Sequence, residues 1–350
     1  MADRLSWKEK KMMKVKKRVA LILIILSVAV MLSGCTPTSP QSNVENLPST
    51  QVPLAAAPNL AASSQTPTLS PRERWGIDEF VIVLLPGEDS PETAYTRNLF
   101  DTALGEVLGI PVKEYHGNNY SACVEAMRTG HAHAASLGPF AYVHAVERAG
   151  AECFAVTSVD GSHGYYSQII THVDSDIYTL DDLKGRVFGF VDPESTSGNI
   201  VPSNELLNYF EKTIPDITFN DLHINGRFFE SVMFTGNHAN SCQGVFRKDV
   251  EAAAVSSSSL ASQIRNGHVE EDKIRIIHTS PLIPASPLSI KGDLPQDLKD
   301  LVISFFLEWG DEEFWSIRAA SSQGASRYWP VYDHEYDYVR ELRDKFDLTD

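Results

Sequence analysis

The chain has 350 residues, of which 43% are hydrophobic and 22% are charged, and its formal net charge is −16 at pH 7. This composition is ordinary for a globular protein with room for two lobes, and it excludes collagen-like, wholly disordered and disulfide-dense chains. The charge argues against a nucleic-acid-binding protein, because such proteins bind phosphates with Lys and Arg clustered on a folded surface. Eight of the 30 cations lie instead within the first 18 residues.

The N-terminal segment has the pattern of a secretory signal. Residues 19–32 are apolar except for Ser27 and are too few to span a bilayer comfortably. The motif Leu32-Ser33-Gly34-Cys35 resembles the lipobox of bacterial lipoproteins, in which the cysteine is linked to diacylglycerol and becomes the N-terminus. We therefore expect residues 1–34 to be a lipoprotein signal peptide, Cys35 to be lipidated, and the folded part to lie outside the cytoplasm, anchored to the cell membrane. The alternative is an uncleaved N-terminal anchor.

The segment after the lipobox is poor in large apolar side chains. Residues 36 to about 72 are rich in Pro, Ser, Thr, Gln, Asn and Ala, with Glu45 as their only acid. Such a segment cannot offset its ordering entropy by burial, so residues 35–75 are predicted to be a flexible tether. Without residues 1–34 the chain carries 22 cations and 44 anions, a net charge near −22. Attachment to an anionic membrane would therefore depend on the lipid.

From Glu79 onward, short apolar runs alternate with segments of helical periodicity. The first series is predicted to contain a strand over residues 80–85, a helix over 91–108, a strand over 111–115, a helix over 120–129 and a strand over 134–137. The second is predicted to contain a strand over 186–191, a helix over 205–212, a helix after Asn240, a strand over 252–255 and a helix from Leu260. This alternation indicates largely parallel sheets with helices on their faces.

Two extended apolar segments, one between the two series and one after the second, predict the domain organisation. Residues 166–172 and 274–278 could carry the chain to a second lobe and back, while residues 294–309 and 332–346 are helical by spacing and return to the first lobe. The predicted fold is α/β, with two lobes joined by two crossover strands and a ligand cleft between them. Lobe 1 would comprise residues 76–167 and 276–350, and lobe 2 residues 168–275. Hinged clefts of this kind close around small ligands.

A hydroxyl-rich turn is the most informative motif. The predicted strand ends at Val191, Pro193 interrupts it, and three hydroxyl residues follow: Ser195, Thr196 and Ser197. At the start of a helix the first N–H groups lack intrahelical partners and the helix dipole adds positive partial charge, so an oxyanion can bind there. The alternative is that Ser195 is a plain N-cap. Pro202 indicates a short opening turn before the main helix.

The residues around this turn resemble a known family. Asp192-Pro193-x-Ser195-Thr196-Ser197-Gly198-x-x-x-Pro202 looks like the signature of the phosphate-, phosphite- and phosphonate-binding proteins of ABC importers. Other matching pieces are Leu180-x-x-Leu183-Lys184-Gly185, Gly138-Pro139-x-x-Tyr142, Gly164-Tyr165-Tyr166-Ser167, Gly236-Asn237-His238 and Ser280-Pro281-Leu282-Ile283-Pro284. The resemblance spans roughly residues 80–307, in the family's order.

The resemblance implies a type II periplasmic-binding-protein fold and a function in transport rather than catalysis. It implies that Ser195, Thr196 and Ser197 hold the phosphorus oxyanion. Tyr120 and Tyr166 would line the cleft from the first lobe and its exit strand, and His238 would donate from the second lobe; the alternatives are core tyrosines and a solvated histidine. The implied protein is a monomeric, lipid-anchored solute receptor that passes its ligand to an ABC permease, without a cofactor.

Two departures from the family's pattern bear on the ligand. Lys248-Asp249-Val250-Glu251 stands where the family commonly has Gly-x-Val-Asp, and Ser256 to Ser259 stand where a second acid would often follow. In relatives that bind aminoalkylphosphonates, acids in this half of the cleft are expected to meet the ammonium group. Glu251 is the candidate for that role in this sequence, and the two departures argue against an amine-bearing ligand.

Other functions have weaker support. A Ser-dependent hydrolase is one alternative, but the chain has no G-x-S-x-G, P-loop or H-E-x-x-H motif; a partner-dependent sensor with the same fold is another. His131 and His133 have no carboxylate or thiolate partner at ligand spacing, so we expect no metal site. The three cysteines beyond Cys35 allow one disulfide, between Cys123 and Cys153, or three buried thiols.

Overall fold

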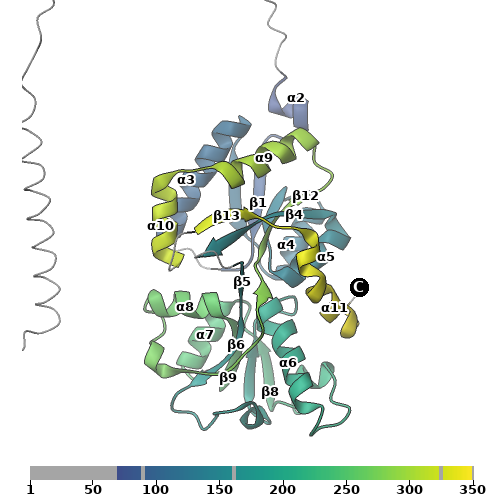
Figure 1. Ribbon diagram of the computed structural model, residues 1–350, viewed down its shortest axis with the longest axis vertical. Helices are drawn as coiled ribbons and strands as arrows, with labels where there is room; N and C mark the ends of the chain where they lie inside the picture. The colour runs from purple at the N-terminus through teal and green to yellow at the C-terminus, as the bar shows by residue number, and fades with distance from the viewer. Residues whose placement is uncertain (1–68, 88–90, 160–162, 323–325, 349–350) are drawn as a thin grey trace, which may run out of the picture. The chain divides into compact units, whose positions relative to one another are not determined.

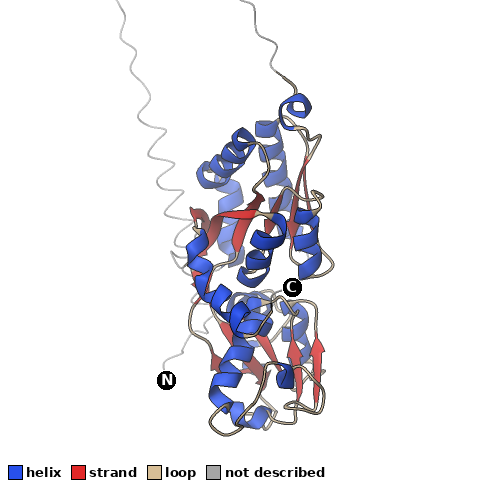
Figure 2. Ribbon diagram, turned by 90° about the vertical axis from the view of Figure 1, so that its right-hand side faces the viewer, coloured by secondary structure: helices blue, strands red, loops and turns tan. Residues whose placement is uncertain are grey.

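The computed structural model of the chain describes residues 69–87, 91–159, 163–322 and 326–348, which belong to one compact unit (Figure 1). The predicted signal peptide, Cys35 and most of the predicted tether lie outside these ranges. Among the helices within them, none is both long enough and apolar enough to cross a membrane. The described chain forms two α/β lobes, and helices flank the strands of both (Figure 2).

Lobe 1 contains a six-stranded sheet in the order β13-β4-β12-β3-β1-β2. Its strands are β1 (Phe80–Leu84), β2 (Val112–His116), β3 (Ala134–Ser136), β4 (Ala151–Val159), β12 (Pro287–Lys291) and β13 (Ser326–Pro330). Strand β1 pairs in parallel with β2 and β3, as the sequence predicts. The chain then adds three antiparallel strands that were not predicted, with β12 between β3 and β4 and β13 on the other side of β4.

Helices cover both faces of this sheet. They are α2 (Pro71–Trp75), α3 (Pro91–Leu108), α4 (Tyr120–Arg128), α5 (Pro139–Ala149), α9 (Gln296–Glu308), α10 (Glu312–Ser322) and α11 (Asp337–Lys345), the last preceded by the turn η6 (Asp333–Tyr336). Phe80 and Ile82 lie in the same apolar cluster as residues of α3, α9 and α10, whereas Val81 and Val83 lie in the cluster that includes residues of α4, α5 and α11. Figure 1 shows these helices around the sheet of lobe 1. Strand β1 is thus buried on both faces, which explains its unbroken apolar run.

Lobe 2 contains a five-stranded sheet in the order β10-β6-β9-β7-β8. Its strands are β6 (Ser167–His172), β7 (Val187–Phe190), β8 (Ser231–Phe234), β9 (Ala252–Ser256) and β10 (Ile274–Thr279). Its helices are α6 (Val201–Phe210), α7 (His238–Phe246) and α8 (Ser257–Arg265), with the shorter turns η2 (Leu180–Leu183), η3 (Thr196–Ile200), η4 (Asn220–Leu222) and η5 (Glu271–Lys273). Strands β7, β8 and β9 are parallel, and β6 runs antiparallel to β9 and β10.

The connection between the lobes is a pair of short strands. Strand β5 (Gly164–Tyr165) pairs antiparallel with β11 (Ile283–Pro284) and joins neither large sheet. The predicted crossover segments, residues 166–172 and 274–278, form β6 and β10 inside lobe 2 instead. The predicted return to lobe 1 at residue 276 therefore falls within β10.

The end of the predicted tether is folded. In α2, Ser70 caps the helix by accepting from the N–H of Glu73, and the Glu73 carboxylate accepts from the N–H of Ser70. Trp75 is buried, and its Nε1 donates to Asp297 of α9 over 3.1 Å. Residues 70–75 thus pack on lobe 1. The composition of the segment predicts a flexible tether, but the single large ring of Trp75 is enough to hold its end against the lobe.

Candidate ligand-binding site

A cavity of about 250 Å³ lies between the two lobes. Its described lining consists of Leu85, Pro86, Tyr120, Gly138, Tyr165, Ser195, Thr196, Ser197, His238, Ser256, Ser258, Ser259 and Ser286. Most of these residues follow the carboxyl ends of parallel strands in both sheets, which is where α/β proteins bind ligands. Two larger hollows, of about 540 and 490 Å³, lie beside β2 and α3, but they are more open and none of the predicted site residues lines them.

Several helices begin at this cavity because the local sequence caps them there. Asn119 accepts from the N–H of Ala122 at the start of α4, Asn237 from that of Asn240 in α7, and Ser256 from that of Ser259 in α8. Helix α5 starts at Pro139, whose fixed φ suits a first helical position. Helix N-termini carry positive partial charge, so this arrangement favours an anion, although no Lys, Arg, Asp or Glu occurs among the described lining residues.

The predicted hydroxyl turn lies at the cavity as a wide opening turn before α6. In η3 the N–H of Ile200 donates to the carbonyl of Ser195 over 3.0 Å, and α6 then begins at Val201, next to the predicted Pro202. Gly198 permits this turn, because a Cβ there would lie 2.4 Å from the Cβ of Val191.

Each hydroxyl of the turn has a distinct setting. Ser195 Oγ accepts from the N–H of Gly198 over 3.1 Å, so Ser195 is an N-cap as well as a lining residue. Thr196 Oγ1 accepts from the N–H of Phe140 in lobe 1 over 2.8 Å. Ser197 Oγ lies 3.5 Å from Nε2 of His238. The structure therefore brings all three predicted hydroxyl residues to one wall of the cavity.

His238 lines the cavity in a form that a hydrogen bond determines. Its Nδ1 accepts from the N–H of Ser256 over 3.1 Å, and burial lowers the pKa of His238 to about 4. A neutral imidazole whose Nδ1 accepts must carry its proton on Nε2. His238 thus offers an N–H donor beside Ser197. The same tautomer cannot take a proton from Ser197, so the two do not form the nucleophile and general base of a hydrolase.

The structure selects a different second tyrosine from the one predicted. Tyr120 is 4% exposed and lines the cavity, and burial raises its pKa well above the usual range. Tyr166 is 42% exposed and is absent from the described lining; its backbone N–H donates to Ser257. Tyr165 lines the cavity instead, because successive side chains of an extended chain point to opposite sides. Burial raises the pKa of Tyr165, while neighbouring hydroxyls, including those of Ser197 and Ser286, oppose that shift.

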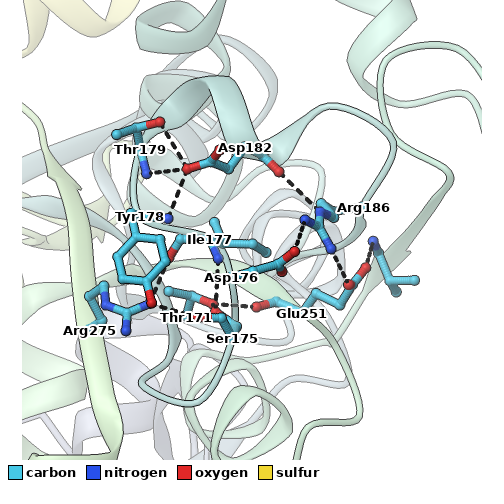
Figure 3. A network of polar contacts seen from close by, with 11 residues as sticks. Thr171, Ser175, Asp176, Ile177, Tyr178, Thr179, Asp182, Arg186, Glu251 and Arg275 are labelled. Atoms are coloured by element: carbon cyan, nitrogen blue, oxygen red, sulfur yellow. Dashed lines mark hydrogen bonds and ion pairs between the residues drawn. The ribbon is translucent and has the colours of Figure 1, made fainter.

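Glu251 is engaged in a polar network elsewhere in lobe 2 (Figure 3). Its Oε2 accepts from the N–H of Val187 over 2.7 Å, and its Oε1 contacts Arg186 at 3.2 Å. Arg186 also binds Asp176. Glu251 therefore stabilises the start of β7 and is absent from the described lining, whereas Ser256, Ser258 and Ser259 from the same region line the cavity.

The remaining candidate groups are not brought together. Cys123, Cys153 and Cys242 are free thiols, and Cys123 donates to the carbonyl of Leu84 over 3.3 Å. Burial raises the pKa of Cys123 and of Cys242 to about 12. His133 is buried, and its Nδ1 accepts from the N–H of Val81, whereas His131 is exposed.

Comparisons with known proteins identify the family of the chain. The sequence profile of a family described as "ABC transporter, phosphonate, periplasmic substrate-binding protein" matches residues 82–336. The phosphonates-binding periplasmic protein of Escherichia coli is 30% identical over 236 residues, which cover 66% of this chain and 65% of that protein, slightly less than two thirds of its length. The phosphate-import protein PhnD of Mycolicibacterium smegmatis is 26% identical over 281 residues, 76% of this chain and 85% of that protein.

Solved structures share the fold. A binding protein component of an ABC phosphonate transporter from Pseudomonas aeruginosa has a TM-score of 0.67 at 24% identity, covering 77% of this chain and 86% of that one. PhnD1 from Prochlorococcus marinus, in complex with methylphosphonate, has a TM-score of 0.65 at 17% identity, covering 78% and 99%. These likenesses confirm the predicted type II fold of two α/β lobes. The family profile that matches residues 82–336 describes transport binding proteins rather than enzymes, and these residues make up most of the sequence. The chain therefore belongs to the phosphonate-binding family of periplasmic ABC-transporter substrate-binding proteins.

Proposed function

We propose that this protein captures a small phosphorus oxyanion (phosphate, phosphite or a phosphonate) between its lobes and delivers it to the membrane permease of an ABC importer. The observation that carries the proposal is the cavity at the helix N-termini, with its lining of hydroxyls and one neutral imidazole N–H. These groups can donate to several oxygen atoms of one tetrahedral anion at once. The names of the relatives, which include phosphonate and phosphate proteins, support this ligand class.

Short-range hydrogen bonds must supply the affinity. Without residues 1–34 the chain is strongly negative, but charge is screened over about 8 Å at physiological salt, so distant acids matter little at the site. Hydrogen bonds to a charged group contribute roughly 1.5–3 kcal/mol each. Five or six of them would offset the costs of desolvation and association and leave micromolar or tighter binding.

The size of the cavity favours a small ligand. Its volume of about 250 Å³ is below the roughly 300–1,000 Å³ that holds drug-sized molecules. Ser256, Ser258 and Ser259 line the side formed by β9 and α8 and can hydrogen-bond a polar substituent on phosphorus. An alkyl or hydroxyalkyl group suits this wall better than an ammonium, because the N-terminus of α8 is itself positive.

The steps outside the cavity belong to the same proposal. Lobe closure would occur by rotation about β5 and β11, which form a separate strand pair between the two large sheets. Cleavage of the signal peptide and lipidation at Cys35 would hold a monomer at the membrane, outside the cytoplasm, within reach of the permease. These N-terminal features lie outside the described residues, and the lipobox and tether sequence support them.

A thermal-shift and calorimetry panel tests the ligand class. We expect phosphate, phosphite or methylphosphonate to raise the melting temperature by mass action, and sulfate, taurine and 2-aminoethylphosphonate to have smaller effects. If none of the three preferred compounds binds at millimolar concentration, the proposed function is wrong.

Substitutions test the site assignment. In Ser197→Ala we expect the dissociation constant to rise about tenfold or more, because one charge-assisted hydrogen bond is lost, and adding Ser195→Ala should raise it further. Ser203→Ala is the matched control, since this buried serine belongs to α6 but does not line the cavity. Equal affinities for Ser197→Ala and Ser203→Ala would place the ligand elsewhere.

A further inference from the structure

Beside the hydroxyl turn, the buried carboxylate of a lobe 2 residue contacts side chains of lobe 1. Glu194 precedes Ser195 directly and is 7% exposed. Its Oε1 accepts from Ser121 Oγ of α4 over 2.7 Å and lies 3.4 Å from Nδ1 of His144 in α5. Ser121 makes a hydrogen bond to this oxygen. Neither ring nitrogen of His144 has a hydrogen-bond partner among the described residues, and the ring forms an ion pair with Glu194 only when it is protonated. Both partners belong to lobe 1.

The environment keeps this carboxylate ionised at a cost. Burial raises the pKa of Glu194, but His144 and Ser121 outweigh burial and lower it below its ordinary value. Its Oε2 is buried without a hydrogen-bond partner among the described residues. A buried, incompletely bonded carboxylate costs stability unless its partners stay in place. Separation of the lobes would return Glu194 to water, and closure would return it to Ser121 and His144.

The chain around Glu194 is held against lobe 1 as well. Asp192 accepts from the N–H of Glu194 over 2.9 Å, and its other oxygen lies 3.4 Å from the N–H of Tyr120. Ile200 and Val201, on the far side of the turn, pack in the apolar cluster of lobe 1. Among the described residues, the ionisable groups near Glu194 include His144, Arg148, Asp192 and the thiol of Cys123. The turn that carries Ser195, Thr196 and Ser197 is therefore docked on lobe 1 from both of its ends.

We propose that Glu194 is a positioning residue, which fastens the hydroxyl turn to α4 and α5 in the closed protein and so sets how long a bound oxyanion is retained. The inference rests on the proposed function. It assigns Glu194 no contact with the ligand; Glu194 acts through the position of Ser195 and its neighbours. The contact forms as the lobes come together, so its loss should affect ligand release rather than the first encounter.

Stopped-flow kinetics with phosphate, phosphite and methylphosphonate test this role. In Glu194→Ala we expect the dissociation rate to rise about tenfold or more, with the association rate within about twofold of the wild type. Glu194→Gln should recover most of the retention, because its amide oxygen can still accept from Ser121. Ser121→Ala should raise the dissociation rate to a smaller extent, and it should have no further effect in the Glu194→Ala background.

The control is Glu251→Ala, which removes a carboxylate that bonds only within lobe 2. It should lower the melting temperature and leave the dissociation rate unchanged. Amide hydrogen exchange gives a ligand-free readout: Glu194→Ala should speed exchange in residues 195–201, and Glu251→Ala should not. Wild-type release kinetics in both Glu194→Ala and Ser121→Ala would overturn the inference while leaving the proposed function intact, whereas a wild type that binds none of the three anions would overturn the function itself.

Discussion

At His238, the direction of one hydrogen bond decides what the ring offers a ligand. The N–H of Ser256 occupies Nδ1, so the proton must be on Nε2, toward Ser197 and the cavity. A cationic ring would have to break this bond, because both of its nitrogens donate. The site therefore gains a fixed donor without gaining a charge.

This arrangement predicts a pH dependence of stability. The unfolded chain protonates His238 near pH 6.5, whereas the folded chain does so only near pH 4. The unfolded state thus binds more protons in this window, and the free energy of unfolding should fall as the pH decreases from 6.5 to 4 and be insensitive to His238 above it. In His238→Asn, the acid-induced loss of unfolding free energy should be smaller by on the order of 1–2 kcal/mol. The full pKa shift would predict a larger change, but solvent screens part of it, because the side chain is partly exposed.

Urea denaturation at pH 4.5, 5.5 and 7.5 measures this contribution. The exposed His131 supplies the control variant His131→Asn, which should follow the wild type. If His238→Asn has the same pH dependence as the wild type, the neutral Nε2–H form is not the one that the folded protein holds.

The tyrosines show where residue-level prediction from the sequence stops. The motif Gly164-Tyr165-Tyr166-Ser167 locates the exit strand. The alternation of side chains in a strand shows that the two tyrosines point to opposite sides, but it does not show which of them faces the cavity. In the structure, Tyr165 pairs with Ile283 in the β5–β11 strand pair, and its side chain faces the cavity. Ser286 also escaped prediction, because its place in the cavity depends on a chain reversal about 120 residues after β5.

At the scale of elements, the junction of β7 with η3 and α6 shapes the site. The sequence predicts the strand, the opening turn and the helix near Pro202, because Pro and Gly mark each boundary locally. Within this junction Gly198 approaches Val191 so closely that no larger residue fits: a Cβ would also lie 2.4 Å from Cγ2 of Val191.

Gly198→Ala should therefore displace the hydroxyl turn. We expect a loss of about 1–3 kcal/mol in the free energy of unfolding from overpacking, together with weakened oxyanion binding. Gly244→Ala, on α7, is the matched control, because its Cβ would meet the nearest atom at an ordinary 3.5 Å and alanine favours the helix. Urea titrations with and without phosphate compare the two. A Gly198→Ala protein as stable as the Gly244→Ala protein would contradict the close packing.

Other elements were missed for a shared physical reason. Strands β4, β12 and β13 pair across long separations in sequence, as Val156 with Pro287 and Val156 with Trp329 show. No local turn signal marks such pairs, so the sequence predicts the parallel core of each sheet and not its antiparallel extension. Helix α5 was also missed, although Gly138-Pro139 and Gly150 delimit it.

At the scale of the whole molecule, a strongly acidic chain is proposed to bind an anion. Its net charge is −16 with the signal segment, and near −22 without it. The opposing attraction comes from the N-termini of α4, α5, α7 and α8, which the two parallel cores direct to one cavity. These are local dipoles of neutral groups, so screening by salt affects them little.

We therefore expect the phosphate affinity to be nearly independent of ionic strength. The dissociation constant should change by less than about threefold between 0.05 and 0.5 M NaCl, because the field of the distant acids is already screened over about 10 Å at 0.1 M. Isothermal titration at constant pH measures it, with potassium gluconate in place of NaCl to exclude competition by chloride. A steep, power-law loss of affinity with salt would instead indicate a cationic side chain at the ligand.

The position of Tyr165 relates ligand binding in the cavity to the arrangement of the two lobes. Its backbone belongs to β5, one of the two strands that join the lobes. Its side chain lines the same cavity as Ser197 from lobe 2 and Ser286, which lies between β11 and β12 where the chain returns to lobe 1. The proposed opening of the lobes would therefore move this hydroxyl relative to Ser197 and Ser286. In the proposed function, a ligand bound by these groups would hold the two lobes together, and separation of the lobes would release it.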